Sequence, residues 1–261
     1  MADISRKAWD KYIEVLRKLN DAAADQFKEY LRTHEIETRI QRDAAIEYAY
    51  ALATKYGEAS AALSALMYDS IAELSGAVVP AAQVAQTATA GEVAKAIYGA
   101  STFSQNDDYI SGIVGRMVKQ AGADTTLQNA RRDGAEFAWI SVGDTCAFCE
   151  LLSANGWQHA SADTIKGNHA EHIHANCDCA YAVRFNNSTQ VGGYDPDRYR
   201  DMYYDAPLLE GQKENAKNRI NAMRRQAYAK NKDEINANKR MNYAERQERL
   251  NSSEAEEIEA N

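Results

Sequence analysis

Hydrophobic side chains recur every three or four residues over most of the first half of the chain. From Asp3 to Thr33 this spacing predicts one long amphipathic helix, whose apolar face consists of Trp9, Tyr12, Ile13, Leu16, Leu19, Phe27, Tyr30 and Leu31. A second helical pattern covers Ile36 to Tyr56 and is predicted to stop near Gly57. A third covers residues 58–74 and ends at Gly76, after which Pro80 breaks the pattern.

Shorter helical patterns follow this break. They cover Gly91–Ala100, Asp107–Gln120 and a stretch near Thr125–Arg132. We therefore expect residues 1–134 to form a helical domain, a bundle with alanine-rich and closely packed contacts.

The pattern changes at Gly134. Two short segments rich in aromatic and β-branched residues, Ala135–Val142 and Cys179–Phe185, are predicted to be strands that pair antiparallel, with a helix at about Ala147–Ala154 between them. Residues 135–190 then form a small α+β module. Residues 191–210 are a tyrosine-rich connector, in which Tyr194–Pro207 is expected to be extended.

The last segment, residues 211–261, is a charged tail with an internal repeat. The ten residues from Ile220, INAMRRQAYA, recur from Ile235 as INANKRMNYA, six of them identical, with a period of 15. Large apolar side chains are too sparse here to bury a face, so we expect an extended helix ordered by a partner, or else partial disorder. The fold class is thus mainly α: a helical region, the small module and a helical tail.

Composition agrees with a helical chain and bears on the compartment in which the protein is expected. Of 261 residues 45% are hydrophobic, with only 3 prolines and 5 phenylalanines, a mixture that favours helix. Apolar runs such as Gly76–Val84 are too short to span a bilayer. The first residues, MADISRKAWD, lack the apolar core of a secretory signal, so we expect a reducing cytoplasm in which clustered cysteines bind metal rather than form disulfides.

The net charge of −8 is unevenly distributed. Residues 211–250 hold 11 Lys and Arg against 5 Asp and Glu, which gives +6, and the last eleven residues hold four glutamates. Residues 1–210 therefore carry −8 − 6 + 4 = −10. The basic stretch could contact DNA electrostatically and without sequence specificity, through Arg224, Arg225, Lys239 and Arg240; a solvated helix of mixed charge is the alternative.

All four cysteines and four of the five histidines lie between residues 145 and 185. Cys146-x2-Cys149 and His174-x2-Cys177-x-Cys179 offer five donors, and two-residue spacers let a tight turn direct two side chains at one zinc ion. We expect a structural zinc site with Cys146, Cys149 and Cys177 as ligands. The fourth ligand is Cys179 or His174.

Three other chemistries use similar residues. A redox dithiol does not need the second cysteine pair. A zinc deaminase has its His-x-Glu before the cysteine pair, whereas His169-Ala170-Glu171 follows it here. A zinc-supported nuclease could use His172 and Asn176, but one histidine-rich turn is a weak signal. The roles of His159, His169 and His172 stay open.

The cysteine and histidine spacing carries a resemblance. With Cys-x2-Cys, a tryptophan-containing loop and then HANCDC (His174–Cys179) leading into a strand, residues 136–185 resemble the minor head (head morphogenesis) proteins of tailed bacteriophages, the group related to the Mu F protein. Residues 1–135 agree only in helical character. Members often have Pro-Asn and Arg where this chain has Ala175-Asn176 and Asp178, so the likeness is in the donor pattern.

The resemblance implies a structural protein and not an enzyme. It implies a virion component, present inside the phage head near the portal and, during assembly, in the host cytoplasm. Its expected partners are portal or capsid proteins, with packaged DNA as a further candidate, and with no membrane and no small-molecule substrate. Its role would be in head assembly, DNA packaging or DNA delivery, with zinc as a structural cofactor. The alternative functions are a zinc-containing DNA-binding protein and a zinc-supported nuclease.

Overall fold

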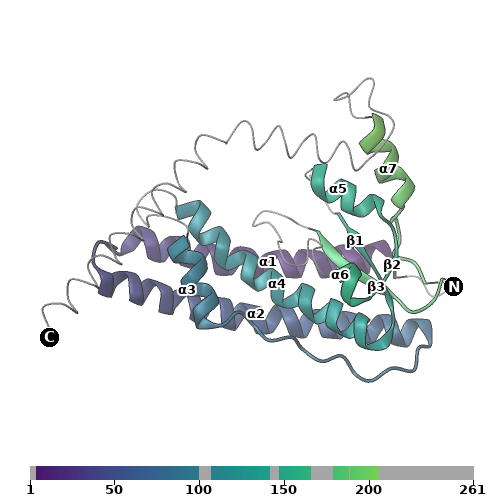
Figure 1. Cartoon of the computed structure of the whole chain (residues 1–261), viewed down its shortest axis with the longest axis horizontal. Coiled ribbons are helices and arrows are strands. Elements are labelled where there is room, and N and C mark those ends of the chain that lie inside the picture. Colours follow the sequence, from purple (N-terminus) through teal and green to yellow (C-terminus); the bar gives the residue numbers. More distant parts are fainter. Residues whose placement is uncertain (1–3, 100–106, 142–146, 166–178, 188, 206–261) are drawn as a thin grey trace, which may run out of the picture. The chain divides into compact units, whose positions relative to one another are not determined.

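The structure is a computed structural model of the whole chain, in which residues 4–99, 107–141, 147–165, 179–187 and 189–205 are described (Figure 1). The chain divides into two units, residues 1–203 and 204–261. Nearly all of the described residues belong to the first unit. The predicted helical tail, residues 211–261, lies outside the described residues, as does its repeat.

Three long helices form the body of the molecule (Figure 1). They are α1 (Arg6–Thr33), α2 (Arg39–Ser75) and α4 (Asp107–Asp133), and each packs against the other two. The short helix α3 (Ala90–Gly99) packs against α2 and α4. The mainly helical fold predicted from the periodicity is confirmed.

Local signals in the sequence account for several helix ends. Ser5 caps α1 by accepting a hydrogen bond from the Ala8 backbone N–H at 3.2 Å. Thr38 and Gln41 form a capping box at the start of α2. This helix ends at Gly76, as predicted, because glycine adopts the left-handed conformation (φ 66°) without the steric cost of a Cβ atom.

The predicted break near Gly57 is wrong, because α2 runs through this residue without interruption. A Cβ atom at Gly57 would lie 2.9 Å from Cγ2 of Thr87. The glycine therefore allows the segment that contains Thr87 to pack directly on the helix. Its role is close packing within a helix rather than helix termination.

The two helices predicted over Asp107–Gln120 and Thr125–Arg132 are one continuous helix, α4. The glycine between these patterns is again a packing residue. A Cβ atom at Gly122 would lie 2.6 Å from Oγ of Ser60 and 2.8 Å from Oγ of Ser64, both on α2. The missing side chain lets α2 and α4 approach closely, which a local pattern does not reveal.

Residues 77–89 connect α2 to α3 as an extended segment that we call the strap. Asn129 of α4 fixes it by accepting from the Gln83 backbone N–H at 2.9 Å and donating to the Gln83 carbonyl at 2.8 Å. The Thr125 hydroxyl accepts from the Ala85 backbone N–H at 3.0 Å. Side chains of α4 therefore satisfy strap backbone groups that a helix or sheet would otherwise pair.

A three-stranded sheet follows α4, with the order β2-β1-β3. Its strands are β1 (Glu136–Ile140), β2 (Gln158–His159) and β3 (Ala180–Arg184). The predicted antiparallel pairing of the two main strands is confirmed, with Ile140 opposite Ala180 and Glu136 opposite Arg184. Helix α5 spans Ala147–Ala154, as predicted, and α6 spans Ala162–Ile165. The two-residue strand β2 was not predicted.

The strands share a hydrophobic core with the helices. Trp9 of α1 and Tyr68 of α2 belong to the same buried cluster as Phe137 and Trp139 of β1. The sheet within residues 135–190 therefore shares the core of the helical body. A second cluster, which includes Phe27 and Val114, lies among α1, α2, α3 and α4.

The connector is not extended as expected, because residues 196–205 form helix α7 (Pro196–Asp205). Its start carries two familiar signals. Proline suits the first turn of a helix because its missing N–H needs no partner there. The Asp195 carboxylate also accepts from the backbone N–H of Asp197 at 3.0 Å.

Candidate metal centre

Two of the five predicted metal ligands lie among the described residues. Cys149 belongs to α5, and Cys179 immediately precedes β3. Cys146, His174 and Cys177 lie outside the described residues, so the full ligand set stays a prediction.

The other residues singled out in the sequence are mostly outside as well. These are His169, His172, Arg224, Arg225, Lys239 and Arg240. His159 is an exposed residue of the short strand β2, where it pairs in register with Glu136.

The side of the sheet to which Cys179 belongs follows from strand alternation. Successive residues of a strand point to opposite faces, so Cys179, Tyr181 and Val183 share one face. The register places Trp139 opposite Tyr181 and Phe137 opposite Val183, which adds both aromatic side chains to this face. Cys179 therefore lies on the aromatic face of the sheet.

Helix α5 packs against β1. Leu152 of α5 lines a small cavity together with Trp139 and Tyr181. Cys149 precedes Leu152 by three residues, so both lie on one side of the helix. Cys149 is 0% exposed and Cys179 is 2% exposed, and both belong to the core cluster that contains the sheet. One cysteine from each half of the motif is thus buried in this shared cluster.

The sheet register brings together the described residues on either side of the motif. The end of β1 at Ile140 lies opposite the start of β3 at Ala180. Cys146 follows Ile140 by six residues, and Cys177 precedes Ala180 by three.

Three side chains that sequence reasoning did not identify connect α5, the end of β1 and the segment that follows β3. The Ser141 backbone N–H donates to Oγ of Ser153 at 3.1 Å, which joins the end of β1 to α5. The Tyr194 hydroxyl donates to the Ser153 carbonyl at 2.8 Å, and the Tyr199 hydroxyl donates to the Ser141 carbonyl at 3.2 Å. Burial raises the pKa of Tyr194 above its ordinary value, so it stays a donor at physiological pH. The tyrosine content of residues 191–210 was the only sequence signal for these contacts.

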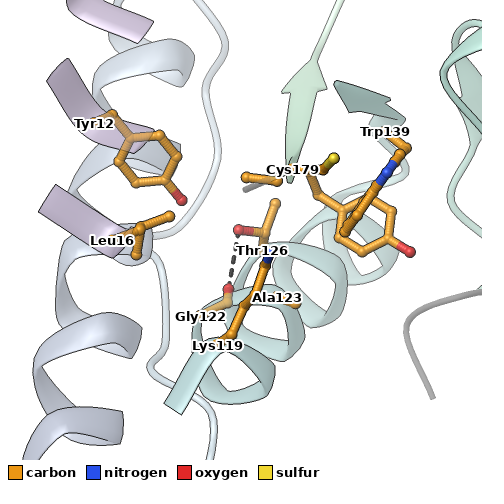
Figure 2. A pocket seen from close by; sticks show the side chains of 10 residues that line it. Tyr12, Leu16, Lys119, Gly122, Ala123, Thr126, Trp139 and Cys179 are labelled. Atoms are coloured by element: carbon orange, nitrogen blue, oxygen red, sulfur yellow. Dashed lines mark hydrogen bonds between the residues drawn. The ribbon is translucent and has the colours of Figure 1, made fainter. Parts of the chain in front are cut away.

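A small cavity of about 20 Å³ lies beside Cys179 (Figure 2). Tyr12 and Leu16 of α1 and Lys119 of α4 line it together with Cys179 and Trp139. Tyr12 hydrogen bonds with Oγ of Ser64 at 3.0 Å, and its burial raises the pKa of the phenol to about 12. A cavity of this size holds about one water molecule, so it is too small for an organic substrate.

Across the described part of the chain, no group of three or more His, Cys, Asp and Glu side chains is arranged to hold a metal ion. This finding covers only Cys149 and Cys179 of the predicted ligands. Among the described helices, none combines the length and the hydrophobicity needed to cross a bilayer.

A comparison of the sequence with models of protein families identifies the family of this chain. The model of the VG15 protein family matches residues 3–206, which is more than three quarters of the chain. The chain belongs to the VG15 protein family. This is a family of viral (phage) gene products, which makes the chain a phage protein. The match covers the helices, the sheet and α7, and it stops where the charged tail begins.

Searches of curated proteins and of solved structures gave no match.

Proposed function

We propose that this VG15 family member is a minor head (head morphogenesis) protein of a tailed phage. It acts inside the head near the portal, in head assembly, DNA packaging or DNA delivery, and it has a structural rather than a catalytic role. Membership in a phage family supports the virion setting. The donor pattern of residues 146–179 supports the likeness to the Mu F-related group.

We also propose that a structural zinc ion joins the two halves of the cysteine motif. The observation that carries this proposal is that Cys149 of α5 and Cys179 beside β3, one from each half of the motif, are both buried in the same hydrophobic cluster. Thiolates are preferred zinc ligands, and a tetrahedral site made only of protein donors is structural. Cys146 and Cys177 would complete the site, with Cys179 or His174 as the fourth ligand.

Metal analysis of the full-length protein, purified under reducing conditions without chelator, tests the zinc ion. We expect about one zinc per chain, because one tetrahedral site uses four of the five donors. Cys149→Ser should lower the zinc content strongly. His159→Gln serves as the control, since this exposed histidine on β2 lies outside the proposed ligand set.

Two further variants identify the fourth ligand. If Cys179 is the ligand, Cys179→Ser weakens zinc binding and His174→Gln leaves it unchanged; the reverse result assigns His174. A wild-type protein that contains no zinc after purification under reducing conditions would exclude the proposed structural zinc ion.

The head role is tested in a phage that carries this gene. Mass spectrometry of purified virions should detect the protein at low copy number, and DNA-filled heads should be lost or reduced when the gene is deleted. Its absence from purified virions together with normal head yield from the deletion would contradict the proposal.

A further inference from the structure

Lys119 is a buried cation in the interior of α4, with only 7% of its surface exposed. Its ammonium Nζ makes neither a hydrogen bond nor an ion pair with any residue that the structure describes. An ammonium group that is removed from water without a partner costs free energy, so buried lysines are normally paired. The N–H donors of Lys119 therefore require an acceptor, and its charge requires an anion.

The side chain of Lys119 extends into the cavity of about 20 Å³ beside the sheet (Figure 2). The walls of this cavity come from α1, α4, β1 and the start of β3, so it lies where the sheet meets the helical body. None of the ten residues that line it is an Asp or a Glu. The ammonium lies 5.9 Å from the centre of the Trp139 ring, a contact that favours a cation but does not neutralise it.

The two hydroxyl side chains Tyr12 and Thr126 that line the cavity do not supply the missing charge. Burial raises the pKa of Tyr12 to about 12, so its phenol is neutral at physiological pH, and it shares a hydrogen bond of 3.0 Å with Ser64. The Thr126 hydroxyl donates to the Gly122 carbonyl at 3.2 Å. The cavity thus contains a cation and neutral polar groups, and its negative partner has to come from a guest.

The size and the charge of the cavity together define this guest. One water molecule needs about 10–15 Å³ of such space, so water fits, but it is neutral and leaves the charge of Lys119 uncompensated. Polyatomic anions such as sulfate and phosphate are too large for a space of about one water molecule. A monatomic anion is only slightly larger than water and carries the required charge.

We propose that this cavity is an internal binding site for a chloride ion, held by the ammonium of Lys119. The bound ion neutralises a buried cation and stabilises the junction of α1, α4 and the sheet. The site does not depend on the structural zinc ion, because the charge of Lys119 holds the chloride and every residue that lines the cavity is a described one.

Thermal unfolding of the full-length protein tests this site. Sodium chloride is exchanged stepwise for sodium gluconate at constant ionic strength, because gluconate is a monovalent anion that is far too large for the cavity. A ligand that binds only the folded state raises the Tm in a saturable way. We expect chloride at about five times its dissociation constant to raise the Tm by about 2–4 °C.

A variant of Lys119 assigns this effect to its charge. Lys119→Met keeps the apolar stem of the side chain and removes the charge, so its Tm should not depend on chloride. In gluconate it should unfold at a higher temperature than wild type, because a buried charge without a partner has been removed. Lys95→Met is the matched control: it removes the charge of an exposed lysine of α3 and should keep the full wild-type response to chloride.

Anomalous diffraction from crystals of the wild-type protein grown in bromide locates the ion directly, even where the variant fails to fold. We expect a bromide peak beside Nζ of Lys119, and the absence of this peak would overturn the proposal. A wild-type Tm that is equal in chloride and in gluconate would also contradict it, as expected if the cavity holds only water or if a residue outside the described ranges supplies the negative charge. An equal chloride response in wild type and Lys119→Met would place the ion elsewhere and exclude this site.

Discussion

Asp133, the last residue of α4, shows how single side chains hold this fold together. Its side chain is 3% exposed and accepts hydrogen bonds from the Tyr68 hydroxyl at 2.8 Å and from two nitrogens of Arg132, each at 2.7 Å. Arg132 also donates to the Pro80 carbonyl at 2.8 Å and to the Ala81 carbonyl at 3.2 Å. One carboxylate therefore links α2, the end of α4 and the strap.

The charge of Asp133 should make stability depend on pH. The hydrogen bond from Arg132 is the main cause that lowers the pKa of Asp133 below its ordinary 3.8. A carboxyl group whose pKa is lowered by folding contributes stability above its unfolded pKa and loses it as the pH falls through the lower, folded value. We expect Asp133→Asn to lower the free energy of unfolding by about 2 kcal/mol at pH 7. The difference from wild type should shrink below about pH 4.

Urea unfolding of both proteins between pH 3 and pH 7 measures this difference. Chelator is present throughout, so that release of metal by acid does not contribute. Tyr68→Phe is the control, since it removes one donor and keeps the carboxylate with its Arg132 partner. A difference between Asp133→Asn and wild type that is constant over this pH range would contradict the assignment.

The same residue type serves different purposes at different places in this chain. Gly76 ends α2 with a positive φ, whereas Gly57 and Gly122 lie inside helices where another element leaves no room for a Cβ atom. The sequence predicts the first role correctly because helix termination is a local event. The other two roles depend on neighbours far away in the chain, which a local pattern does not specify.

At the scale of elements, the strap is the least regular part of the body. Its backbone is fixed largely by side chains of α4, and Asn129 makes both hydrogen bonds to Gln83. Asn129 is only 2% exposed, so its amide is shielded from water. Such bonds recognise the main chain and not the side chains of the strap.

Asn129→Ala should release the strap. We expect a loss of about 2 kcal/mol in the free energy of unfolding, because two backbone groups of Gln83 lose their partners. Hydrogen exchange at the Gln83 amide should become at least about tenfold faster, since local opening now costs less free energy. Mass spectrometry of exchanged peptides covering residues 77–89 measures both the site and the size of the effect.

Gln83→Ala is the matched control for this test. The Gln83 side chain is exposed and its main chain makes the two bonds, so this variant should keep wild-type exchange and stability. Equal exchange rates in Asn129→Ala and Gln83→Ala would show that Asn129 does not hold the strap.

Elements beyond the helical body differ in how well their sequence defines them. The strands β1 and β3 were predicted because aromatic and β-branched residues are concentrated in them. Helix α7 was missed because its tyrosines and its proline suggested an extended segment, although an aspartate followed by a proline is also a helix-start signal. Helix α7 thus begins with a signal that is as local as those of α1 and α2.

At the scale of the whole molecule, the charge is divided between an acidic body and a basic stretch. Residues 211–250 carry a net +6, and residues 1–210 a net −10. We propose DNA as a partner of the basic stretch, with contacts to phosphates only. Such binding releases counter-ions and weakens steeply as salt rises.

A fourfold variant tests this partner: Arg224→Ala, Arg225→Ala, Lys239→Ala and Arg240→Ala. We expect weaker binding to duplex DNA of any sequence and a salt dependence reduced by about one unit of slope for each phosphate contact removed. Fluorescence anisotropy over a series of salt concentrations measures both. The control replaces four exposed lysines of the body with alanine: Lys7, Lys11, Lys55 and Lys95. Equal salt dependence of all three proteins would contradict a DNA contact through these residues.

The sequence by itself determined the features that depend on neighbouring residues. Periodicity defined the helical character of the first 134 residues, residue type defined β1 and β3, and spacing defined the cysteine motif as a metal-site hypothesis. Only the tertiary structure decided that α2 and α4 are continuous and that the sheet shares a core with the helices. It also decided that Cys149, Cys179 and Lys119 are buried. These outcomes depend on packing between segments that are distant in the chain, and local residue patterns carry no information about such contacts.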